Sequence, residues 1–180
     1  IDTILESHVP DSLIESLREL GHTVETTGRI WHGSEFPKTS EDRARLRSVV
    51  DDVIRWRPDA VFVMRACALL PREVDRLRRR GITTVVWYSD DPVFFRKQGE
   101  PLAGHYDITL HTATERILGK YEEELGERGF GMQFWTSQSA FPRLYDAARC
   151  DFDVLFIGNT HTPVRQWRYD WIAGLPLERA

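Results

Sequence analysis

Residues 83–92 read TTVVWYSDDP, an apolar run that stops at two adjacent carboxylates and a proline. A run of β-branched and aromatic residues without polar alternation is typical of a strand buried on both faces of a sheet. The acid pair that follows has three interpretations. Asp91 can be a helix N-cap with Pro92 at the first helical position, or Asp90 and Asp91 can face a ligand. Metal coordination by the pair is a third alternative, but adjacent acids point apart, so we predict no metal site.

Other short apolar runs alternate with segments of helical period along the chain. Strands are predicted at residues 3–7, 22–26, 60–64, 107–111, 132–135 and 154–157. Helices are predicted through Leu13 and Leu17, after Ser40 as N-cap, after Pro71, and through Ile117 to Leu125. Apolar strands separated by helices favour a parallel sheet covered on both faces. We therefore predict an α/β fold with a Rossmann-like, doubly wound parallel sheet.

The composition indicates a folded protein and limits its partners. The 180 residues are 41% hydrophobic and 29% charged, with a net charge of −4. This charge makes nucleic acid or an anionic membrane an unexpected main partner. Residues 76–80, RLRRR, are interpreted as a solvated helix end whose charge suits the helix C-terminus.

Cysteine usage and hydropathy bear on location. Cys67 and Cys150 lie outside any CxxC or Cys/His cluster, which suits free thiols in a reducing cytosol. No apolar run approaches the roughly 20 residues of a transmembrane helix, and no signal peptide is visible. We expect a cytoplasmic protein without a transmembrane segment, although a chain that begins at Ile1 leaves room for a preceding stretch.

Polar side chains follow most of the predicted strands at the point where each strand ends. Because the carboxyl ends of parallel strands share one edge, these side chains are expected to cluster there, where such folds bind ligands. The mixture of acids, a base, imidazoles and hydroxyls suits a polyol or sugar-like ligand. Structural alternatives remain for three members: a loop position for His8, an ion pair for Arg65 and backbone hydrogen bonds for His111. The set comprises His8, Arg65, Ser89, Asp90, Asp91, His111 and Thr112.

A separate constellation lies near the end of the chain, where residues 156–165 read FIGNTHTPVR. Gly158 allows close backbone approach to a ligand, and Arg165 can add bidentate contacts to a phosphate. Asn159 and Thr160 lie between them. The segment is neither a GxGxxG fingerprint nor a P-loop. It follows an irregular, proline-containing stretch, so residues 1–150 are predicted to form one domain and residues 151–180 the opening of a second, incomplete α/β domain.

Four segments occur in an order and spacing that resemble a known family: PDAVFVMRA (58–66), GITTVVWYSDDP (81–92), YDITLHTA (106–113) and FDVLFIGNTHTPVR (152–165). Together they resemble the CgeB-like (spore maturation protein-like) bacterial glycosyltransferases, which have the two-domain GT-B architecture. The resemblance implies an acceptor-side domain in residues 1–150, the start of the donor domain in residues 151–180, and a nucleotide-sugar co-substrate with no other cofactor.

The resemblance also implies roles for the residues singled out above. Asp90 is the first candidate for the catalytic base, followed by Asp91 and His8. Acceptor binding falls to Arg65, Ser89, His111 and Thr112, and donor phosphate binding to Gly158, Asn159, Thr160 and Arg165. Because most of the donor site of such enzymes lies further downstream, these residues alone are expected to be inactive. The alternative is a non-enzymatic α/β module that binds or senses a ligand.

Overall fold

A computed structural model describes residues 9–27, 39–64, 69–88, 96, 99–112, 114–126, 129–132, 170, 171, 173 and 174. The chain divides into two compact units, residues 1–142 and 143–180. In the second unit the described residues form a short helical piece at residues 170–174. The predicted opening of a donor domain in residues 151–180 therefore falls mostly outside the described residues.

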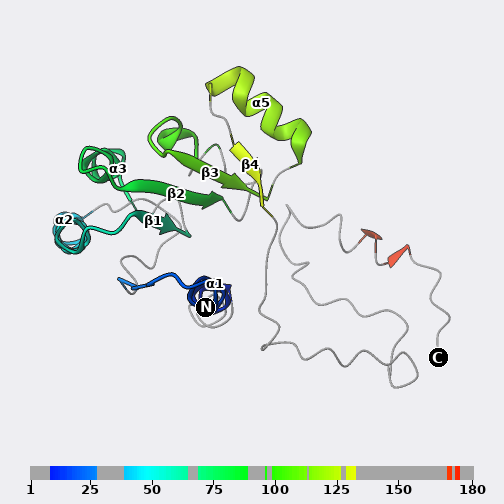
Figure 1. Cartoon of the computed structure of the whole chain (residues 1–180). Helices are drawn as coiled ribbons and strands as arrows, with labels where there is room; N and C mark the ends of the chain where they lie inside the picture. The colour runs from blue at the N-terminus through cyan, green and yellow to red at the C-terminus, as the bar shows by residue number, and fades with distance from the viewer. Residues whose placement is uncertain are drawn as a thin grey trace, which may run out of the picture. The chain divides into compact units, whose positions relative to one another are not determined.

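The first unit contains a parallel sheet of four strands in the order β1-β2-β3-β4 (Figure 1). The strands are β1 (Ala60–Val63), β2 (Thr83–Tyr88), β3 (Ile108–His111) and β4 (Gly129–Gly131). Their register aligns Phe62 with Val85, Val86 with Thr109, and Leu110 with Phe130. With helices flanking this sheet, the predicted α/β class is confirmed, and the arrangement is consistent with a Rossmann-like doubly wound fold.

Helices connect the strands, because parallel neighbours need a crossover between them. The α-helices are α1 (Val9–Glu19), α2 (Ser40–Trp56), α3 (Pro71–Arg78) and α5 (Glu115–Leu125), and a 3₁₀ turn, η2, spans Glu100–Leu102. In sequence, α3 links β1 to β2 and α5 links β3 to β4. Figure 1 shows α2 and α3 beside β1 and β2, and α5 beside β3 and β4.

The hydrophobic core lies between the sheet and the helices α2 and α3. Val86 of β2 is fully buried, as are Leu46 of α2 and Val74 of α3. Val50 and Leu77 pack in the same cluster. Each such side chain contributes about 1.5–3 kcal/mol when it leaves water, so this cluster stabilises the pairing of α2 and α3 with the sheet.

The ends of α2 show why the helix begins and ends where it does. The N-cap is Thr39, one residue before the predicted cap at Ser40. Its hydroxyl accepts from Asp42 N (3.1 Å), and the Asp42 carboxylate accepts from Thr39 N (3.3 Å). This capping box places the Asp42 carboxylate at the third helical position, so the prediction of Ser40 as the cap was one residue late. At the other end Arg57 adopts the left-handed conformation (φ 56°, ψ 57°) that breaks the helix.

One strand prediction is wrong, and one strand was not predicted. Residues 22–26 form no strand; instead the Val24 carbonyl accepts a hydrogen bond from Arg18 Nη2 (2.8 Å). The fourth strand of the sheet is Gly129–Gly131, which was not predicted, and the strand predicted at residues 132–135 lies mostly outside the described residues. Glycine has low strand propensity, so the sequence pattern does not predict a strand at Gly129–Gly131. Its glycines leave room for neighbouring groups.

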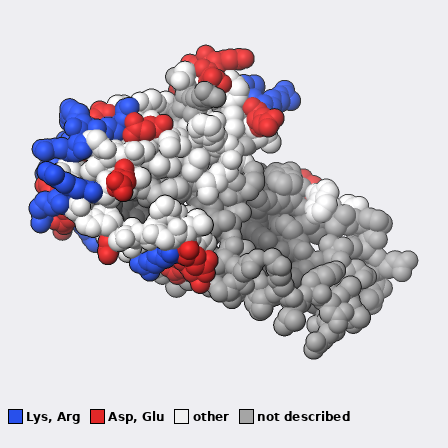
Figure 2. Space-filling model, viewed as in Figure 1, with Lys and Arg blue, Asp and Glu red and all other residues white. Residues whose placement is uncertain are grey.

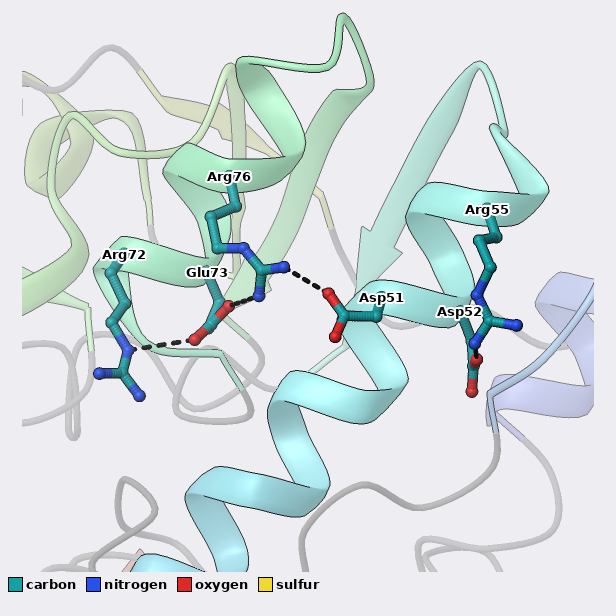
Figure 3. A network of polar contacts seen from close by, with 6 residues as sticks. All are labelled: Asp51, Asp52, Arg55, Arg72, Glu73 and Arg76. Carbon is teal, nitrogen blue, oxygen red and sulfur yellow. Dashed lines mark hydrogen bonds and ion pairs between the residues drawn. The ribbon is translucent and has the colours of Figure 1, made fainter.

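A charged network joins α2 to α3 (Figure 3). The Glu73 carboxylate, 1% exposed, accepts from Arg76 Nη1 (2.7 Å) and Arg72 Nε (3.1 Å). Arg76 also pairs with Asp51 of α2. The hydrogen bond to Glu73, followed by that to Asp51, raises the pKa of Arg76 above its ordinary value. A buried carboxylate is tolerable only with such partners, so the network orients α3 against α2.

A second polar tie holds the amino ends of β2 and β3 together. Asp107 Oδ2 accepts from the Thr84 backbone N–H and hydroxyl (both 2.9 Å), and its Oδ1 accepts from Arg78 Nε (2.7 Å). Partial burial opposes ionisation of Asp107, but the hydrogen bonds from Thr84 and then Arg78 outweigh it and lower the pKa of this carboxyl below 3.8. The ionised form is therefore favoured by folding.

Replacing Arg76 by Met is expected to destabilise the protein by about 2–3 kcal/mol, because the buried Glu73 carboxylate keeps only one guanidinium. The matched change Arg55→Met breaks an exposed pair with Asp52, whose side chains are 75% and 59% exposed. That loss should stay below about 1 kcal/mol. Urea unfolding at neutral pH measures both, and equal losses would contradict a supporting role for Arg76.

Asp107→Asn is expected to cost about 1–2 kcal/mol at neutral pH through loss of the charged acceptor. The pKa of Asp107 is lower in the folded protein than its ordinary value of 3.8. The stabilisation by Asp107 is therefore present at pH values above 3.8 and is lost as the pH falls through the pKa of the folded state. The difference between wild type and variant should therefore shrink in acid. Unfolding free energies measured across this range test the sign, with Asp59→Asn as the control at an exposed carboxylate.

Candidate functional site: the carboxyl edge of the sheet

Two of the predicted site residues, His111 and Thr112, lie within the described part of the chain. The structure brings them to the same edge, where β2 ends at Tyr88 and β3 ends at His111. The other predicted residues lie outside the described residues, and their roles stay predictions. These are His8, Arg65, Ser89, Asp90 and Asp91, together with Gly158, Asn159, Thr160 and Arg165.

Thr112 connects the end of β3 to the end of β2 by hydrogen bonds. Its backbone N–H and its hydroxyl both point to the Tyr88 carbonyl, at 3.3 and 3.4 Å. Tyr88 is the last residue of β2 and precedes Ser89 in the chain. Thr112 therefore holds the point from which the chain continues toward the acid pair. Its side chain is partly exposed, and the acceptor-binding role predicted for it stays a prediction.

His111 is fully buried beneath this edge. Its ring centre lies 4.8 Å from that of Tyr88 and 5.5 Å from that of Tyr121 on α5, with tilted planes in both pairs. Such offset aromatic contacts stabilise by about 0.5–1.5 kcal/mol beyond burial. The imidazole contacts protein on these sides, and its structural alternative, hydrogen bonding to backbone groups, stays a prediction as well. Acceptor binding by His111 stays a prediction.

Gly129 of β4 makes room for the His111 ring. A Cβ atom placed on Gly129 would lie 2.6 Å from His111 Nε2, far inside a normal contact distance. Gly129 was not among the predicted site residues, because the apolar pattern of the sequence does not mark it. One feature of the sequence points to Gly129. It lies in the segment GFG, residues 129–131, directly before the apolar run that was predicted as the strand.

Backbone bonds extend the same edge to β4. Met132 N donates to the His111 carbonyl (2.7 Å), and Trp87 Nε1 donates to the Met132 carbonyl (3.3 Å). Trp87 is 2% exposed, which confirms that it belongs to the core. Hydrogen bonds thus connect the carboxyl ends of β2, β3 and β4. Strands position ligand-binding groups more accurately than loops do.

The described residues contain neither a cluster of metal ligands nor a membrane-spanning helix. Within them, no group of three or more His, Cys, Asp or Glu side chains is arranged to hold a metal ion. Nor does this part of the chain contain a helix with the length and hydropathy needed to cross a bilayer.

Comparison of the chain with protein-family models, curated proteins and solved structures found no match in any of the three.

Gly129→Ala is expected to destabilise the protein by about 1–3 kcal/mol, because the added methyl group overlaps the buried imidazole of His111. Gly131→Ala is the matched control on the same strand. Its added Cβ would meet only Leu118 Cδ1, at 4.0 Å, which is an ordinary contact. Thermal and urea unfolding measure the two variants. A Gly129→Ala protein as stable as Gly131→Ala would show that His111 does not occupy the place described.

Proposed function

We propose that this chain is the acceptor-side domain, with the opening of the donor domain, of a glycosyltransferase that moves a sugar from a nucleotide-sugar to an acceptor hydroxyl. The observation that carries the proposal is the adjacency of Tyr88 and His111 at the carboxyl edge of a parallel sheet. Asp90 follows Tyr88 by two residues in the chain. Open α/β sheets bind ligands beyond this edge.

The four motif segments support the same proposal through their order. Three of them contain described strands, β1, β2 and β3, and each strand falls within the apolar part of its motif. The polar residue that ends or follows the strand is in each case one predicted to bind the acceptor: Arg65, Ser89 and His111. The order of these motifs along the chain supports a proposed acceptor site at the carboxyl edge of the sheet.

In an inverting transfer, Asp90 accepts the proton of the acceptor hydroxyl as its oxygen forms a bond to the anomeric carbon. The bond from that carbon to the nucleotide diphosphate breaks, and its electron pair leaves on the diphosphate oxygen. Asp91 and His8 are the other candidates for the base. A retaining transfer requires no such base.

The remaining proposed residues bind the two substrates. Arg65, Ser89 and Thr112 supply hydrogen bonds to the acceptor. Gly158, Asn159, Thr160 and Arg165 bind the diphosphate of the donor. We propose a cytoplasmic location, because Cys67 and Cys150 lie outside any CxxC or Cys/His cluster, as is typical of free thiols in a reducing compartment.

The test uses the protein encoded by the complete reading frame that contains these residues. Calorimetry with a panel of nucleotide-sugars is expected to identify at least one donor, and Asp90→Asn should then lower turnover by about 100-fold or more at unchanged melting temperature. Asp52→Asn, at an exposed carboxylate on α2, is the control. Lower melting with retained turnover would make Asp90 a structural cap. Binding of no nucleotide-sugar would favour a non-enzymatic ligand-binding module.

A further inference from the structure

The helices α2 and α3 end close together, at the amino edge of the sheet and opposite the candidate site. The carbonyl of Asp59, just after α2, accepts from the N–H of Thr83, at the start of β2 (3.0 Å). The Arg76–Asp51 pair aligns the two helices one turn earlier. In Figure 3 both helices lead into loops at the end of the sheet away from the head of the β1 arrow. We call the residues Trp56, Arg57, Arg79 and Arg80 the arginine edge.

Three arginines of this edge have exposed side chains that form no ion pair within the described residues. Arg57, Arg79 and Arg80 are exposed and form no ion pair with any residue that the structure describes, unlike the nearby Arg55 and Arg78. Figure 2 shows Lys and Arg side chains gathered over α2 and α3. The run RLRRR was interpreted as a solvated helix end. In the structure Arg76 and Arg78 of that run form ion pairs. Arg79 and Arg80 are exposed and can therefore bind an external anion.

The backbone at Arg57 provides an independent observation. Among the described residues it is the one non-glycine residue with a positive φ. α5 ends on Gly126 in the same left-handed conformation, which is the residue that such helix ends favour. Arginine at this position lowers the stability of the fold, yet its guanidinium contributes no ion pair to the described structure. Residues in such sparsely populated conformations cluster at functional sites, which makes Arg57 a candidate for a role outside the fold.

Trp56 directly precedes Arg57 and is 47% exposed, which adds an aromatic residue to this surface. Tryptophan prefers the headgroup level of a bilayer, and arginines pair with lipid phosphates. We infer that the arginine edge docks the protein reversibly on an anionic phospholipid surface. The net charge of −4 opposes nucleic acid and anionic lipid alike, so the choice depends on the extent of the basic surface: a nucleic acid would need a longer basic track than these three arginines. The inference uses none of the residues of the proposed transferase site.

The experiment measures binding of the full chain to phosphatidylcholine vesicles with and without about 30% phosphatidylglycerol, since anionic lipid supplies the attraction. Binding is expected only with the anionic lipid. It should weaken about fivefold for each of Arg57→Gln, Arg79→Gln and Arg80→Gln, and weaken as salt is raised. Trp56→Ala should also weaken it. Arg47→Gln, an equal change of charge at an exposed position of α2 away from this edge, is the control and should bind as wild type.

Arg57→Gly separates docking from folding. It should weaken vesicle binding about fivefold while the melting temperature stays constant or rises by about 2–4 °C through relief of the left-handed strain. The inference is overturned by equal binding to neutral vesicles, by no binding to either kind, or by an equal loss in Arg47→Gln. It is also overturned if the chain binds a nucleic-acid duplex through these arginines and does not bind the vesicles.

Discussion

The structure depends on the pairing of β2 with a parallel strand on each side. β1 and β3 use the hydrogen-bonding groups on both edges of β2, and helices cover the sheet. A strand in this position has little access to water, which is why TTVVWY carries no regular polar alternation and why Val86, Trp87 and Tyr88 are buried. Parallel pairing also places the carboxyl ends of successive strands at one edge. The location of the candidate site is a consequence of this constraint.

Polar groups fasten both ends of this apolar layer. At the amino end, Asp107 satisfies the Thr84 amide and hydroxyl and pairs with Arg78. At the carboxyl end, Thr112 donates to the Tyr88 carbonyl. Beside the sheet, Glu73 lies buried between two guanidiniums and connects α3 to α2. Each of these contacts gives a hydrogen-bond or charge partner to polar groups that would cost free energy if they were buried alone. The contacts therefore select one strand register and one helix packing among those that hydrophobic burial allows.

The two edges of the sheet are suited to different tasks. The carboxyl edge has a base of His111, Tyr88 and Tyr121, on which a ligand site can be held in place. The amino edge presents Arg57, Arg79 and Arg80 beside an exposed indole. A transferase that docks by its amino edge keeps its carboxyl edge open to substrates, so the two proposals are compatible. They are also independent, because they share no residue.

The sequence by itself determined the fold class, the strand TTVVWY at residues 83–88, the helix start at Pro71 and the strand that ends at His111, because apolar periodicity and proline chemistry are local properties. It placed the α2 cap one residue late, because Ser40 and Thr39 are both good caps and Asp42 decides between them. Only the tertiary structure showed that Gly129–Gly131 forms a strand, that His111 is buried and that Arg76 and Arg78 are paired while Arg79 and Arg80 are not. Those features depend on which residues distant in the chain become neighbours, and that is decided by packing.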